Sequence, residues 1–134
     1  MRYMLDTDTC IYLIKQKPPE VLAHVQLHKP GDVVLSAITL AELEFGVEKS
    51  SARQRNRSAL DALTELIPSV EFDSAAAAAY GAVRHRLERH GLPIGSLETL
   101  IAAHAVGLSL TLVTNNERHF GRIPGLGLEN WAHS

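Results

Sequence analysis

The segment Arg2–Asp8, which reads Arg-Tyr-Met-Leu-Asp-Thr-Asp, indicates the fold because its short apolar run ends abruptly in carboxylates. Arg2–Leu5 fits a short buried strand, and Thr7 or Asp8 can cap a helix that runs through Ile14. A strand followed at once by a helix is the opening unit of an α/β protein.

The same alternation continues to the end of the chain. Short β-branched or apolar runs predict further strands at 33–35, 70–72, 110–114 and 126–131, the last as an edge strand. Helices are predicted between them, beginning at Pro18 or Pro19, at Ser36 or Thr39, in the polar stretch 49–57, at Ser74 and at Ser96. Residues 115–117 are predicted to form a loop. This order predicts one α/β domain over residues 1–134, with a mostly parallel sheet between two layers of helices.

The composition limits the classes of function. The 134 residues are 46% hydrophobic, enough for a buried core, and their formal net charge is -2. Such a charge gives no long-range attraction to nucleic acid, so RNA binding would need local positive charge or metal ions. The single cysteine, Cys10, excludes an internal disulfide and favours a reducing compartment. With an acid already at position 6, and no apolar run near the ~20 residues that span a membrane, we expect a soluble, cytoplasmic protein.

Four polar residues fall where a ligand site is expected. Asp6 and Asn116 each follow a predicted strand, Glu42 lies in the helix after the second strand, and Glu98 lies in the first turn of the helix opened by Ser96. In open parallel sheets, ligands bind beyond the carboxyl ends of the strands, where these groups can converge. Clustered carboxylates repel one another unless they hold hard cations such as Mg²⁺ or Mn²⁺, which can support phosphodiester cleavage.

Each of the four also has a purely structural interpretation. Asp6 can be a helix cap, Glu42 a solvent-facing acid on an apolar helix, Glu98 a first-turn acid that stabilises the helix dipole, and Asn116 a turn residue. Their joint occurrence at strand ends is the reason to consider them together.

Four ordered blocks resemble PIN-domain ribonuclease toxins of the VapC type. The blocks are Met4–Asp8, Ser36–Val47, Pro93–Gly95 with Leu100–Ala105, and Leu112–Phe120 with Ile123–Leu126 and Glu129–Trp131. They cover almost the whole chain in order. The resemblance implies a PIN-like α/β/α sandwich with a four- or five-stranded parallel sheet and Mg²⁺- or Mn²⁺-dependent endoribonuclease activity. It further implies a partner antitoxin, homodimers or a larger assembly with the antitoxin, and cleavage of transfer RNA near the anticodon.

By position, the resemblance assigns Asp6, Glu42 and Glu98 as catalytic metal ligands, with Asn116 in a fourth place that is often an acid. Thr114 would help to orient water or metal. The family normally has Asp where this chain has Glu98. The longer side chain either ligates metal from a slightly shifted backbone or leaves the site catalytically weakened, and Asp8 is either a further carboxylate at the metal or a helix acid.

Two other functions compete with the ribonuclease. Asp6-Thr7-Asp8 resembles the D-x-D motif of haloacid-dehalogenase-like phosphatases, although no cap domain, partner lysine or late acidic pair accompanies it. A non-catalytic PIN-like module that binds antitoxin or RNA is the second alternative, motivated by Glu98.

The remaining polar residues carry weaker signals. Arginines at positions 53, 55, 57, 84, 86 and 89, with Lys49, either bind phosphates or form a solvated surface. The seven histidines show no zinc-site spacing, so His104 is predicted to be packed in the core, as is Cys10.

Overall fold

Five parallel strands form the central sheet. The computed structural model describes residues 1–132. The strands are β1 (Tyr3–Leu5), β2 (Val33–Ser36), β3 (Ser69–Val70), β4 (Thr111–Val113) and β5 (Leu128–Glu129). Their order is β3-β2-β1-β4-β5, and every pair is parallel. The predicted α/β class and parallel sheet are confirmed, and the last strand lies at an edge as expected.

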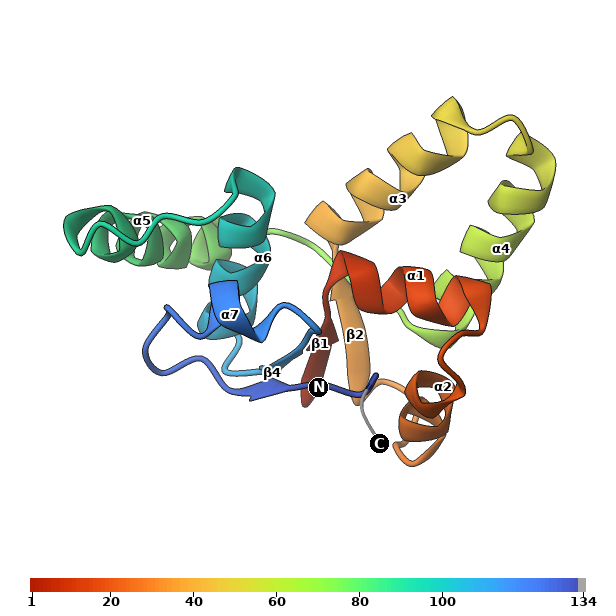
Figure 1. Cartoon of the computed structure of the whole chain (residues 1–134), viewed down its shortest axis with the longest axis horizontal. Coiled ribbons are helices and arrows are strands. Elements are labelled where there is room, and N and C mark those ends of the chain that lie inside the picture. The colour runs from red at the N-terminus through yellow and green to blue at the C-terminus, as the bar shows by residue number, and fades with distance from the viewer. Residues whose placement is uncertain (133–134) are drawn as a thin grey trace.

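Helices cover both faces of the sheet (Figure 1). On one side lie α1 (Thr7–Lys15), α2 (Pro19–Gln26), α3 (Ala37–Lys49) and α4 (Arg53–Leu66). On the other lie α5 (Ser74–Arg89), α6 (Ser96–Gly107) and the short α7 (Glu117–Phe120). In Figure 1, α3 and α4 form an arch over α1, while α5 projects from the opposite side of the molecule.

The period of two along each strand divides the core into two layers. Tyr3 and Leu5 pack with α1 to α4, whereas Met4 between them packs with α5 and α6. In β2, Leu35 and Val34 divide in the same way. Successive strand side chains point to opposite faces, so strands buried on both sides are apolar at every position.

Two helix caps lie one or two residues before the predicted ones. The side chain of Asp6, not Thr7 or Asp8, caps α1 by accepting a hydrogen bond from the Thr9 backbone at 2.9 Å. In α5 the cap is Asp73, and Ser74 is the first helical residue. In each case a carboxylate directly precedes the predicted cap and satisfies a free backbone N–H in the first turn.

Ser36 caps α3, as one of the two predicted alternatives, by accepting from the Ile38 backbone at 3.0 Å. The predicted cap of α6 is wrong, because Gly95 occupies that position and Ser96 is the first helical residue. The side chain of Glu98 folds back instead and accepts from the Gly95 backbone N–H at 3.1 Å. Glu98 therefore makes one half of a capping box at the start of its own helix, since Gly95 has no side chain to make the other half.

Several boundaries differ from the predicted ones, and β4 and β5 are shorter than predicted. The polar stretch 49–57 is divided, because α3 ends at Lys49 and α4 begins at Arg53. The third strand is shorter and earlier than the predicted 70–72. Residue 117, predicted to lie in a loop, is the first residue of α7. No helix within residues 1–132 is long and apolar enough to cross a membrane.

Candidate metal centre

The carboxyl ends of β1 and β4 bring distant residues together. Leu5 pairs with Val113 in the sheet, and the Asp6 backbone N–H donates to the Val113 carbonyl at 3.0 Å. The hydroxyl of Thr9 donates to the same carbonyl at 3.2 Å. The segment after β1 is therefore fixed against the end of β4, where Thr114 and Asn116 follow.

Asp6 is a buried carboxyl group that accepts hydrogen bonds but has no counter-ion among residues 1–132. Only 5% of the residue is exposed. Burial raises the pKa of Asp6 above its ordinary value, and hydrogen bonds from Thr114 and Thr9 oppose that rise in part. No ion pair within residues 1–132 includes Asp6. A negative charge here therefore lacks a counter-ion among these residues. Buried carboxylates are usually paired or bound to a metal ion, so a bound cation would stabilise this one.

Glu42 faces the beginning of α1 rather than solvent. The Thr7 hydroxyl donates to Glu42 Oε1 at 2.6 Å and lies 3.4 Å from the Thr39 hydroxyl. Because Thr7 directly follows Asp6, this contact brings Glu42 of α3 to the edge of the sheet where Asp6 lies.

Glu98 accepts hydrogen bonds from three groups. Besides the Gly95 backbone, the amide Nδ2 of Asn116 donates to Oε2 at 2.6 Å, and His119 Nδ1 lies 3.0 Å from Oε1. Glu98 therefore acts as an acid at the start of its helix, and it also contacts a second predicted site residue, Asn116.

Asn116 connects the two halves of the site. Its backbone N–H donates to the Thr114 hydroxyl at 2.8 Å. The Thr114 side chain in turn interacts with the Asp6 carboxyl and lowers its pKa. Contacts therefore run from Glu98 through Asn116 and Thr114 to Asp6, whose neighbour Thr7 holds Glu42. The structure thus brings all four predicted residues to one edge of the sheet.

The four side chains are linked rather than tightly clustered. Among residues 1–132, no three His, Cys, Asp or Glu side chains are placed to hold one metal ion. The donor chemistry nevertheless fits a hard divalent cation, because the side chains are oxygen donors and the buried Asp6 carboxyl has no ion-pair partner among residues 1–132.

Sequence reasoning missed Thr7 and His119. The sequence predicted Thr7 only as a possible helix cap. Its contact with Glu42 depends on how α3 packs against α1. His119 had a usable signal, since it lies three residues after Asn116, the N-cap of α7. That spacing places two side chains on the same side of a helix start, but α7 itself was not predicted.

A model of the PIN domain matches residues 3–126. The chain belongs to the PIN-domain family. Within it, the chain is 42% identical to "Ribonuclease VapC2" of Rickettsia felis over 98% of both chains. It is 39% identical to "tRNA(fMet)-specific endonuclease VapC" of Shigella flexneri, over 98% of this chain and 99% of that one. It is therefore a member of the VapC group of ribonucleases, as the four sequence blocks indicated.

Solved structures agree with this assignment. The fold is similar to one chain in the crystal structure of VapBC2 from Rickettsia felis bound to a DNA fragment from their promoter. The TM-score is 0.92 at 41% identity, with 98% of this chain and 99% of that chain covered. PIN-domain ribonucleases need a divalent metal ion, in agreement with the oxygen donors at the sheet edge, and the family assignment favours a nuclease over the phosphatase alternative.

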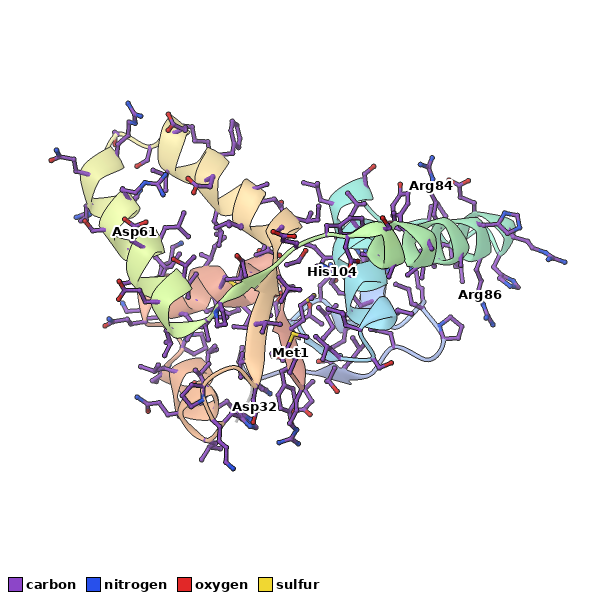
Figure 2. The ribbon with its side chains drawn as sticks, turned by 180° about the vertical axis from the view of Figure 1, so that it is seen from behind. Met1, Asp32, Asp61, Arg84, Arg86 and His104 are labelled. Carbon is purple, nitrogen blue, oxygen red and sulfur yellow. The ribbon has the colours of Figure 1, made fainter. Side chains whose placement is uncertain are left out.

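His104 connects the two helices that carry Glu42 and Glu98 in this PIN domain. It lies on α6 near the linker to α5 (Figure 2) and is 1% exposed, as predicted for a core residue. Its Nδ1 lies 2.8 Å from the hydroxyl of Ser36, the cap of α3. Nε2 has no partner of hydrogen-bonding geometry among residues 1–132. Burial lowers the His104 pKa, and the Glu71 backbone and Asp73 carboxylate offset this only in part.

The stability of the protein is expected to fall below about pH 6.5, the ordinary pKa of histidine. Because folding lowers the His104 pKa, the folded state favours the neutral ring, and its contribution is lost as pH falls from the unfolded to the folded pKa. Urea unfolding between pH 7.5 and pH 5.5 measures this. The free energy of unfolding of His104→Gln should depend less on pH than that of the wild type. In the control His85→Gln, which alters an exposed histidine, the pH dependence should be that of the wild type. An unchanged dependence in His104→Gln would contradict the assignment.

The arginines that were predicted as possible phosphate ligands do not form one surface. Arg53 pairs with Glu48 at 2.9 Å, Arg57 pairs with Glu44, and Arg84 pairs with Glu88 at 2.8 Å. Figure 2 shows Arg84 and Arg86 projecting from opposite sides of α5. Contact with RNA phosphates therefore stays a prediction for the arginines outside these pairs.

Proposed function

We propose that this chain is the toxin of a type II toxin–antitoxin pair and cuts transfer RNA near the anticodon with a divalent metal ion. The observation that carries the proposal is the run of contacts joining Glu98, Asn116, Thr114 and Asp6, with Glu42 held beside them by Thr7. The names of the VapC relatives, one of them specific for a transfer RNA, support the substrate class.

In this proposal Asp6 and Glu98 bind the metal, Glu42 holds it directly or through water, and Asn116 supplies a further ligand. A bound divalent ion supplies positive charge that activates water and stabilises the leaving oxygen of the phosphodiester. Thr114 orients Asp6 and Asn116 through its hydroxyl, and Thr7 orients Glu42. The buried position of Asp6 keeps bulk water away from its carboxylate.

The test is cleavage of a purified transfer-RNA pool in Mg²⁺, in Mn²⁺ and in a chelator. We expect defined fragments with either metal and none in the chelator. Sequencing of the fragment ends gives the cut position, which should lie in or near the anticodon loop. Cleavage that persists in the chelator would contradict metal dependence, and cuts scattered over the RNA would contradict the anticodon assignment.

A non-catalytic module that binds antitoxin or RNA is the second candidate. It is favoured by the engagement of Glu98, whose two oxygens already accept from Gly95, Asn116 and His119. Metal binding must compete with these contacts. Absence of cleavage at every metal concentration, together with intact antitoxin binding, would select this candidate.

For the partner, we propose that the antitoxin occupies the groove enclosed by α1, α3 and α4. The groove encloses about 1220 Å³ and has Glu42 and Thr7 among its lining residues. Its walls include Phe45 and Leu97, which are 65% and 45% exposed. Its lining has three basic residues, Lys15, Lys49 and Arg55, against two acids, Asp8 and Glu42, so it favours a mainly apolar segment with acidic residues placed near the basic ones. The VapBC complexes among the similar solved structures support an antitoxin partner. We also propose that the chain forms a homodimer.

Phe45→Glu is expected to weaken binding of the antitoxin at least about tenfold, because it places a charge on the apolar wall of the groove. Calorimetric titration with the purified antitoxin measures the change. Leu66→Glu is the matched control, since Leu66 is 50% exposed but does not line the groove. Equal affinity of the Phe45→Glu variant and the wild type would exclude this groove as the binding surface.

A further inference from the structure

His119 lies against the candidate metal centre although no role was predicted for it. Its Nδ1 atom lies 3.0 Å from Glu98 Oε1 and 3.2 Å from Oε2. The His119 side chain is 40% exposed and that of Glu98 is 28% exposed. A histidine–carboxylate pair as open to solvent as this adds little to folding stability. Its main consequence is that an imidazole nitrogen is available beside the carboxylate.

The spacing of these atoms suits two ligands of one ion. Neighbouring ligands of an octahedral ion, each about 2.1 Å from it, are roughly 3 Å apart. The distance from Nδ1 to Oε1, 3.0 Å, agrees with that separation. In the hydrogen bond to Glu98, Nδ1 carries the proton. A metal ion that took the place of this proton would meet the Nδ1 lone pair of a neutral ring whose proton is on Nε2.

A third donor lies beside the same carboxylate. The side-chain amide of Asn116 lies 2.6 Å from Glu98 Oε2, so an amide group, a carboxylate and an imidazole face one another. With the amide turned over, Asn116 would present its oxygen instead of its nitrogen. The contact through Thr114 then connects this set to the buried carboxyl of Asp6.

We propose that His119 is a nitrogen ligand of the catalytic metal and that it makes this centre prefer Mn²⁺ over Mg²⁺. This inference rests on the proposed function, because it concerns the same metal centre. Mg²⁺ favours oxygen ligands and holds its water tightly, whereas transition-metal ions accept imidazole readily. A site with the carboxylates alone would discriminate less between the two ions.

The first test is calorimetric titration of the metal-free full chain with Mn²⁺ and with Mg²⁺ separately. We expect tighter binding of Mn²⁺ by the wild type. His119→Gln, which keeps a polar group of similar length, should weaken Mn²⁺ binding about tenfold and Mg²⁺ binding less than about twofold. His85→Gln, which alters an exposed histidine of α5, should bind both ions as the wild type does. An unchanged ratio of affinities in His119→Gln would overturn the inference.

The second test is pulsed electron paramagnetic resonance of the Mn²⁺-loaded protein, which detects a directly bound nitrogen. The nitrogen coupling should be present in the wild type and in His85→Gln and absent in His119→Gln. Manganese bound without nitrogen coupling would overturn the role of His119. If Asp6→Asn then still abolished binding, the proposed metal centre would stand. A wild type that bound neither ion would remove both the inference and the proposed function.

Discussion

Asp6→Asn is expected to lower kcat/KM for RNA cleavage by about 10³-fold, or roughly 4 kcal/mol at about 1.36 kcal/mol per factor of ten. The substitution removes the buried charge that is proposed to hold the metal but keeps the cap of α1, because Asn and Asp are similarly good N-caps. Single-turnover cleavage of the transfer RNA in saturating metal measures the loss.

The same substitution is expected to raise the melting temperature of the metal-free protein at pH 7. Burial raises the Asp6 pKa, so its contribution to stability is present at low pH and is lost as pH rises through the folded-state pKa. Asn avoids burying the charge, and its advantage should shrink as pH falls and Asp6 takes up a proton. Metal should stabilise the wild type and not the variant, because the proposed metal site is intact only in the wild type.

Asp73→Asn is the control, because Asp73 caps α5 with the same geometry as Asp6 caps α1. It should leave the cleavage rate unchanged. An Asp6→Asn variant that cuts at the wild-type rate would exclude Asp6 from the catalytic site. A variant with a lower melting temperature than the wild type in chelator would contradict the prediction that the buried Asp6 charge destabilises the metal-free protein.

Glu98→Gln is expected to reduce cleavage by about 10³-fold, since it removes the charge at a proposed ligand while preserving the length that reaches Gly95. The melting temperature should change little. Glu98→Asp separates length from charge. The shorter side chain withdraws the carboxylate from Asn116 and His119 by more than about 1 Å, a misplacement that can cost about 10²-fold in rate.

Cleavage rates of both variants beside Glu88→Gln, an exposed acid on α5, measure these effects. A Glu98→Asp variant more active than the wild type would mean that Glu98 weakens this member of the family. The non-catalytic candidate would then be the better description of the natural chain.

Much of the architecture was predictable from local patterns. The apolar runs ending at Leu5, Leu35 and Val113 are strands because they bury both faces, and such strands are apolar at every position. Parallel strands end at one edge of the sheet, so Asp6 and Asn116 could be placed on the same side. The error at the cap of α6 arose because a glycine at the cap relies on the folded-back side chain of Glu98.

The partners of the site residues were decided by tertiary structure. The sequence by itself determined the residue types, their order and the sheet edge to which Asp6, Glu42, Glu98 and Asn116 belong. It did not determine that Thr7 would hold Glu42 or that His119 would meet Glu98, contacts that span 35 and 21 residues of chain. Such contacts depend on how α1 packs on α3 and on where α7 begins. Those placements are set by burial of side chains from the whole chain, so no local pattern encodes them.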